Sequence, residues 1–251
     1  MTTTTRRPIP VERPARGRRK WPWITLAAIA VIAGVLLHSP WLSVGDIEIR
    51  GADQADVAGR VAATGVGEGA ILVWVDTGAV ADAVLADPWV RDVLVDRVWP
   101  DRLLVEVLEH RPALWVEGVR GWMLVSRDGT VLERTAVPGT GLPVASMALP
   151  DLAPGDRPSD PAWHELVELV AVLPEDIAAG IVLEMRGPEM WTEIHGHPVR
   201  FGHPIDLAAK GLTLAALIET DLPPQATLDL VAPRRPAVVP VDAGGEVEAE
   251  G

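Results

Sequence analysis

The sequence of 251 residues contains no cysteine and no tyrosine, and only one phenylalanine. The absence of cysteine excludes disulfide bonds, thiolate metal sites and cysteine nucleophiles, and it fits either side of a membrane. Ten tryptophans supply the aromatic bulk instead. Three flank an apolar run, and we expect the others to pack in the core or at sheet edges rather than to form a sugar-stacking platform. These seven are Trp74, Trp89, Trp99, Trp115, Trp122, Trp163 and Trp191.

Positive charge is scarce outside the first 41 residues. That stretch holds seven arginines and lysines against one acid, Glu12, which gives +6 and leaves −19 for the rest of a chain of net charge −13. An acidic folded part repels nucleic acid phosphates, whereas a basic cluster beside an apolar run suits an anionic membrane surface. We therefore expect a lipid bilayer as a partner and no nucleic acid.

One long run, from Trp21 to Leu37, carries no charge. As a helix rising about 1.5 Å per residue, it is just long enough to cross the hydrocarbon core of a bilayer. Trp21 and Trp23 at one end, and Leu37 and Trp41 at the other, suit the two membrane interfaces. The excess of basic residues before the run predicts a single span at residues 21–41, with residues 1–20 in the cytoplasm and the remainder outside.

Two other interpretations of this run are weaker. A secretory signal usually ends in a small-x-small cleavage site, whereas this run ends in Leu36-Leu37-His38. A buried core helix would not need seven flanking cations. The sequence therefore favours a membrane anchor.

The stretch after the anchor alternates between strand and helix patterns. Residues 44–50 alternate as a half-buried strand does, and Asp53 is positioned to cap a helix that Gly65 ends. Asp76 is positioned to cap a second helix, over residues 77–86. Aliphatic strands follow at residues 90–99 and 102–109, separated by Pro100-Asp101. The predicted order is β-α-α-β-β.

Beyond Pro112 the patterns indicate a mixed β domain with two helices. Asp128-Gly129 is a hairpin turn signal, and Asp160-Pro161 opens an amphipathic helix that Pro174 stops. A loop rich in proline and glycine occupies residues 137–161, and a second helix is expected over residues 205–220. Strands are expected at residues 113–117, 122–126, 130–133, 181–185, 191–195, 199–201, 226–230 and 237–241. We expect the acidic tail at residues 242–251 to be disordered.

Catalytic patterns are weak throughout. No serine lies in a G-x-S-x-G elbow, and the glycine-rich stretch at residues 65–69 follows a helix and lacks the P-loop lysine. Glu106 and Glu109 lie on one strand and are typical of a solvated face. We expect no enzyme, no cofactor and no small-molecule substrate.

The one candidate metal site is a histidine cluster, His195, His197 and His203. An H-x-H pair on a strand can direct both rings to one face, as zinc requires. Gly196 and Pro198 favour a turn between two strands instead, so we expect no metal.

Several segments, in this order, resemble the FtsQ/DivIB family of bacterial divisome proteins. Three of these segments are similar to the POTRA module of that family, namely Val44–Gly51, Gly69–Asp76 and Pro88–Val107. The segments after them are similar to its junction and β domain. Phe201 and Val231-Ala232-Pro233 depart from the family pattern. The matching segments are Val44–Gly51, Gly69–Asp76, Pro88–Val107, His110–Ala113, Ser126–Val131, Val199–Gly202, Lys210 and Leu228–Leu230.

The resemblance implies an α+β protein with one transmembrane helix, a POTRA domain at residues 42–110 and an FtsQ-type β domain at residues 111–241. It also implies a non-enzymatic cell-division scaffold that gathers FtsB/FtsL-like partners and, through them, the septal peptidoglycan synthase at the division septum. A membrane-anchored protein that binds the cell wall is the alternative, and a glycan pull-down separates the two.

The final strand is the expected docking edge for a partner. An unpaired sheet edge offers a row of backbone donors and acceptors that a partner strand can complete. Pro236 and Pro240 bracket this strand, and an edge tolerates proline because its missing N–H need not face a neighbour. The expected contact residues are Pro236, Ala237, Val238 and Val239, with Asp229 positioning them.

Overall fold

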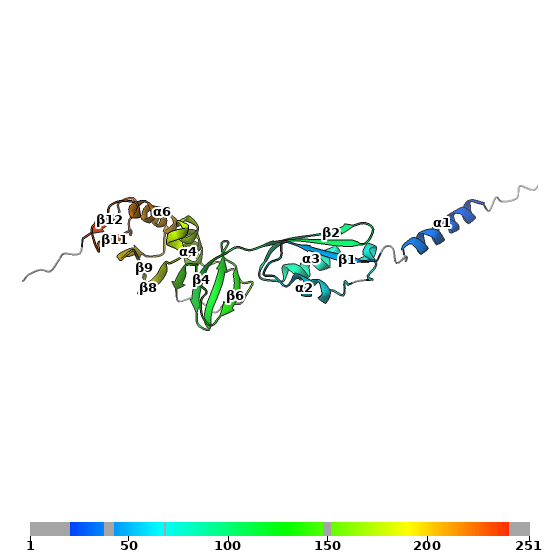
Figure 1. Cartoon of the computed structure of the whole chain (residues 1–251), viewed down its shortest axis with the longest axis horizontal. Coiled ribbons are helices and arrows are strands. Elements are labelled where there is room, and N and C mark those ends of the chain that lie inside the picture. The colour runs from blue at the N-terminus through cyan, green and yellow to red at the C-terminus, as the bar shows by residue number, and fades with distance from the viewer. Residues whose placement is uncertain (1–20, 38–42, 68, 148–151, 241–251) are drawn as a thin grey trace, which may run out of the picture.

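The computed structural model describes residues 21–37, 43–67, 69–147 and 152–240. Its elements follow one another along the long axis of the molecule, from helix α1 at one end to strand β12 at the other (Figure 1). Two sheets divide the folded part. The first domain is built on strands β1 to β3, and the second domain on strands β4 to β12.

The first domain has the predicted β-α-α-β-β order. Its sheet has the strand order β1-β3-β2, in which β1 runs parallel and β2 antiparallel to the central β3. Its elements are β1 (Asp46–Arg50), α2 (Val57–Ala63), the 3₁₀ helix η2 (Leu72–Trp74), α3 (Thr77–Leu85), β2 (Val90–Val98) and β3 (Arg102–Glu109).

The caps of the two helices confirm one prediction and correct another. Asp76 caps α3, since its carboxylate accepts hydrogen bonds from the N–H groups of Gly78 and Ala79. Helix α2 is capped by Asp56 and not by Asp53. Glu109 Oε1 accepts the backbone N–H groups of residues 53, 54 and 55 at 2.8–2.9 Å, which holds that turn outside the helix.

The second domain is a nine-stranded mixed sheet with the order β12-β11-β10-β9-β8-β7-β4-β5-β6. Its strands are β4 (Pro112–Gly118), β5 (Gly121–Ser126), β6 (Val131–Thr135), β7 (Val144–Ser146), β8 (Val182–Arg186), β9 (Glu189–Ile194), β10 (His197–Gly202), β11 (Thr227–Asp229) and β12 (Ala237–Val239). Its helices are α4 (Pro161–Val172), α5 (Glu175–Ala178) and α6 (Leu207–Ile218).

Two short elements of this domain were not predicted. Strand β7 lies inside the proline- and glycine-rich stretch, where it pairs in parallel with β4 and with β8. Its three residues carry no pattern of their own, so its pairing with distant strands is what makes it a strand. Helix α5 is a single turn after Pro174.

The core of the second domain lies on one face of the sheet, where α4 packs against α6 and against β4. Trp163 of α4 and Phe201 of β10 are both fully buried. The tryptophans were expected in the core or at sheet edges. Trp74 corrects this expectation, because it is 66% exposed in the 3₁₀ helix η2. Trp99, which is 54% exposed, directly follows the edge strand β2.

Helix α1 (Trp21–Leu37) covers the apolar run and has 17 residues. Within the described ranges, no helix is both long and apolar enough to cross a membrane. The side chain of Trp23 is exposed. Trp41, the basic tail at residues 1–20 and the acidic tail at residues 242–251 lie outside the described residues, as do the side chains of Trp21 and Leu37.

Candidate partner-docking edge

Strand β12 is the outermost strand of the nine-stranded sheet, as the sequence predicted. It pairs antiparallel with β11 alone, with Thr227 opposite Val239, Leu228 opposite Val238 and Asp229 opposite Ala237. In Figure 1 these two strands lie at the end of the molecule farthest from α1.

The backbone of Val238 faces away from the sheet. On the other side of β11, the N–H of Leu230 donates to the carbonyl of Arg200 at 2.8 Å, so Leu228 and Leu230 direct their backbone groups towards β10. Because backbone groups alternate along a strand, Thr227 and Asp229 direct theirs towards β12. Their partners Val239 and Ala237 are therefore hydrogen-bonded, and the N–H and C=O of Val238 point outwards.

This edge carries no charged side chain. The other edge strands of the described sheets, β1, β2 and β6, each contain both acidic and basic residues, which block pairing with another chain. Strand β12 reads Ala-Val-Val. Among the four sheet edges, it is the one best suited to accept a further strand.

The side chains of β12 divide between two faces. Val238 is partly buried and packs against the core of the domain, whereas Ala237 and Val239 are exposed on the opposite face. Pro236 and Pro240, also exposed, flank the strand. The core contact anchors the strand while its outer backbone remains open.

Asp229 is held by an ion pair with Arg200. The guanidinium donates to Asp229 Oδ2 at 3.0 Å and to both carboxylate oxygens of Glu189, so one arginine links β9, β10 and β11. The carboxylates of Glu189 and Asp229 raise the pKa of Arg200. The hydrogen bond from Arg200 lowers the pKa of Glu189. Sequence reasoning gave Arg200 no role, although its opposite charge to residues on neighbouring strands was a usable signal.

Asp229 also shapes the turn that leads towards β12. Its Oδ1 accepts the N–H of Val231 at 3.0 Å, directly after the strand. Arg200 in turn lies with its Cζ 5.9 Å from the ring centroid of Trp191. The arrangement fixes the turn geometrically, as the predicted positioning role requires, and it offers backbone recognition rather than chemistry.

Of the three clustered histidines, His195 lies in a turn between two strands, His197 begins β10 and His203 follows it. His195 and Gly196 join β9 to β10 with φ angles of 52° and 80°. The Nδ1 of His197 lies 3.0 Å from the carbonyl oxygen of Ala226, to which its protonated tautomer donates. Among the described residues, no group of three or more histidine or acidic side chains is arranged to hold a metal ion.

The fold and its open edge define a class of protein: a POTRA-type domain followed by a mixed β domain, with a binding surface and no catalytic centre assigned. The family described as "POTRA domain, FtsQ-type" matches residues 42–110. "Cell division protein FtsQ" of Streptomyces bingchenggensis is 30% identical over 240 residues, covering 89% of this chain and 89% of that protein. The chain belongs to the FtsQ/DivIB family of cell division proteins.

Other relatives agree with this assignment. "Cell division protein FtsQ" of Mycolicibacterium smegmatis is 30% identical over 230 residues, covering 89% of this chain and 66% of that protein, so the chain spans about two thirds of its length. A solved structure of the major extracytoplasmic domain of DivIB from Geobacillus stearothermophilus matches with a TM-score of 0.31 and 16% identity, over 45% of this chain and 99% of that one, which is too distant to add to the assignment. The family is non-enzymatic, which confirms the expectation that the chain is not an enzyme.

Proposed function

We propose that this protein is a membrane-anchored scaffold of the divisome. Residues 21–41 hold the chain in the cell membrane as a single span, residues 1–20 remain in the cytoplasm, and the two domains, at residues 42–110 and 111–241, lie outside at the division septum. The uncharged run, its flanking tryptophans and the excess of basic residues before it support this topology.

In this proposal, strand β12 accepts an extended segment of an FtsB/FtsL-like partner and thereby links it to the septal peptidoglycan synthase. The observation that carries the proposal is the outward N–H and C=O of Val238 on an uncharged edge. A partner strand that pairs there forms hydrogen bonds worth about 0.5–1.5 kcal/mol each, net of those lost to water.

The arrangement around β12 supports docking without rearrangement. The partly buried side chain of Val238 anchors β12 on the core, and the Arg200–Asp229 ion pair ties the neighbouring β11 to β10. The exposed side chain of Val239 adds apolar area beside the open backbone. A strand that is already ordered loses little conformational entropy when its partner binds.

Val238→Pro tests the proposal, with Val238→Ala as its matched control. Proline removes the outward N–H and restricts the backbone, whereas alanine keeps the N–H and only shortens the side chain. We expect Val238→Pro to weaken binding of the FtsB-like partner at least several-fold and Val238→Ala to have a small effect, because a lost hydrogen bond and a lost register act together.

Binding is measured with the full chain reconstituted in phospholipid vesicles, and circular dichroism verifies folding. Unchanged affinity of a folded Val238→Pro protein would place the docking edge elsewhere. If the unmodified chain does not float with the vesicles, the proposed membrane anchor is wrong. The docking edge would then be tested in solution.

A further inference from the structure

A hollow of about 380 Å³ lies where the first domain meets the second. Both domains contribute cations to its wall. Arg91 comes from β2, Arg111 immediately precedes β4, and Arg127 immediately follows β5. The imidazole of His110 also lines the hollow, and its side chain is only 10% exposed.

The three arginines have no side-chain hydrogen bond or ion pair in the part of the chain that the structure describes. Five other arginines each lie within 4.0 Å of a carboxylate: Arg50, Arg60, Arg102, Arg186 and Arg200. Three arginines face two carboxylates, Glu109 and Asp128, in the lining of the hollow, so positive charge is in excess there.

The acidic residues of the hollow are occupied in other ways. Glu109 Oε1 accepts the three backbone N–H groups described above. Asp128 Oδ1 accepts the hydroxyl of Ser126 at 2.5 Å. His110 Nδ1 lies 3.0 Å from that oxygen, and the two groups form an ion pair when the imidazole is protonated. The donors left for a ligand with acceptor groups are therefore those of the three arginines.

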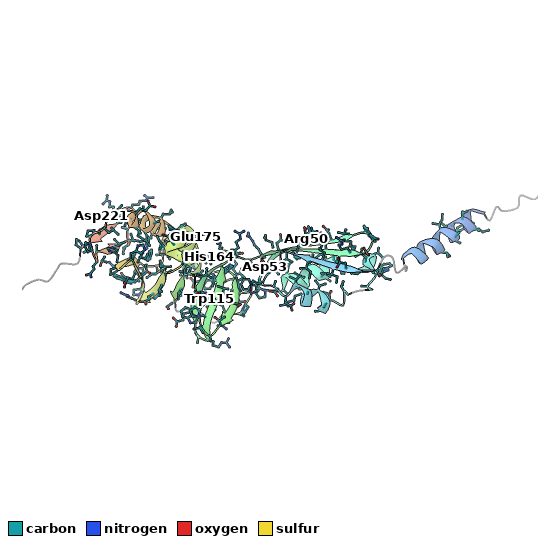
Figure 2. The ribbon with its side chains drawn as sticks, viewed as in Figure 1. Arg50, Asp53, Trp115, His164, Glu175 and Asp221 are labelled. Atoms are coloured by element: carbon teal, nitrogen blue, oxygen red, sulfur yellow. The ribbon has the colours of Figure 1, made fainter. Side chains whose placement is uncertain are left out.

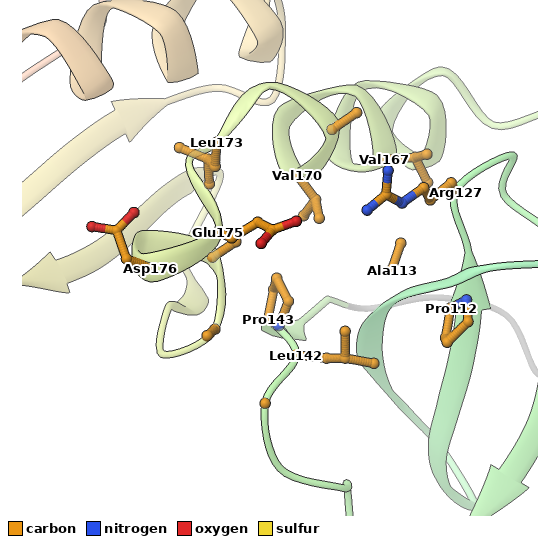
Figure 3. A pocket seen from close by; sticks show the side chains of 14 residues that line it. Pro112, Ala113, Arg127, Leu142, Pro143, Val167, Val170, Leu173, Glu175 and Asp176 are labelled. Carbon is orange, nitrogen blue, oxygen red and sulfur yellow. The ribbon is translucent and has the colours of Figure 1, made fainter.

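A second hollow of about 610 Å³ is adjacent to the first, since Arg127 lines both. Figure 3 shows Arg127 on one side of it and Asp176 on the other, with aliphatic side chains and Glu175 between them. Ala113, Val167, Val170 and Leu142 supply this apolar lining. From the first hollow to the far side of the second, the lining side chains are first arginines, then aliphatic residues, then the carboxylates of Glu175 and Asp176.

We propose that these two adjacent hollows bind an extended peptide segment of a partner protein, with carboxylates at one end, aliphatic residues in the middle and a cation at the other end. Guanidinium groups bind carboxylates in a two-pronged geometry, which gives both energy and orientation. The aliphatic residues fill the groove, and the cation faces Glu175 and Asp176. This site is separate from the β12 edge, which lies at the far end of the second domain (Figure 1).

The test uses the full chain and a capped synthetic peptide of three glutamates followed by Leu-Val-Leu and a lysine. A matched peptide carries glutamine in place of each glutamate, and inorganic pyrophosphate serves as a non-peptide anion. Fluorescence anisotropy of the labelled peptides measures affinity. We expect the glutamate peptide to bind at least about tenfold more tightly than the glutamine peptide, because only carboxylates pair with the arginines.

Two double variants carry the same change in charge. Arg111→Gln with Arg127→Gln should weaken binding of the glutamate peptide by about tenfold or more. Arg234→Gln with Arg235→Gln, between β11 and β12, should leave it unchanged. Circular dichroism of both variants verifies folding, and Val238→Pro should bind the peptide normally, which separates this site from the docking edge.

Three results would overturn the proposal. The first is absence of binding by the glutamate peptide to the unmodified chain. The second is an equal loss in the two double variants, which would show a general charge effect. The third is tighter binding of pyrophosphate than of the peptide with competition between them, which would assign the hollow to a phosphate ligand.

Discussion

The two domains bury different kinds of side chain. The first domain has a core of valines and two leucines, with no aromatic residue among its fully buried members. The second buries Trp163, Phe201 and Met123 between its sheet and its helices. Figure 2 shows the side chains of both domains along the molecule. Both cores join strands that are distant in sequence, since β1 pairs with β3 in the first domain and β4 pairs with β7 in the second.

Truncation of a large buried side chain in each domain is the strongest test of this comparison. Trp163→Ala should cost about 3–5 kcal/mol, because it removes a buried indole and its hydrogen bond to the carbonyl of Gly129. Leu103→Ala should cost about 2–5 kcal/mol in the first domain. Hydrogen exchange measured by mass spectrometry assigns each loss to its domain.

Each substitution should speed exchange in its own domain and leave the other within about 0.5 kcal/mol. Leu94→Ala, at a site 54% exposed, is the control and should change neither. Equal destabilisation of both domains by Trp163→Ala would show that they unfold as one unit. The packing of Trp89 from the first domain against the cluster of Trp115, Leu124 and Leu132 in the second would then be the place to look for that coupling.

The comparison also explains how much of the fold the sequence predicts. In the first domain the strands, the two α-helices and the cap Asp76 follow from local periodicity and turn residues, whereas the cap of α2 was misplaced and the 3₁₀ helix η2 was not predicted. In the second domain the strands were found except β7, but nothing local predicts that β7 lies between β4 and β8. Strand order depends on contacts distant in sequence, which a single chain's pattern does not encode.

The candidate docking edge was likewise predicted only in part from the sequence. Its place as the last strand and its bracketing prolines identified β12 as an edge strand from the sequence. The direction in which Val238 points its N–H depends on its register with β11 and β10, and so does the bond between Arg200 and Asp229. Trp74 was expected in the core or at a sheet edge and is exposed, because hydrophobicity alone does not tell whether a second layer covers a turn.

A buried lysine provides a smaller contrast between the domains. Among the described residues, the second domain buries the ammonium of Lys210, which donates to the carbonyl of His203 at 2.9 Å, whereas the first buries no cation. Burial lowers the pKa of Lys210, although Asp206 and Glu165 oppose the shift. The unfolded chain therefore binds this proton more tightly than the folded one.

Folding stability should consequently rise with pH between the lowered pKa and the ordinary value of about 10.4. Lys210→Met removes this titration and is the reference for other groups that titrate at alkaline pH. Across that pH window, the free energy of unfolding measured in urea should rise more for the wild type than for the variant. The difference should be at most about 1.4 kcal/mol for each unit of pKa shift. A difference that does not change with pH would mean that the folded protein leaves the pKa of Lys210 unchanged.

The docking role of β12 is tested most directly by the hydrogen exchange of single backbone amides, followed by NMR with and without the FtsB-like partner. In the free chain, the outward amide of Val238 should exchange faster than those of Ala237 and Val239, which bond to β11. At saturation with the partner, exchange at Val238 should slow by about tenfold or more, because its N–H then donates to the added strand. Unchanged exchange at Val238 in a saturated complex would contradict strand addition at this edge.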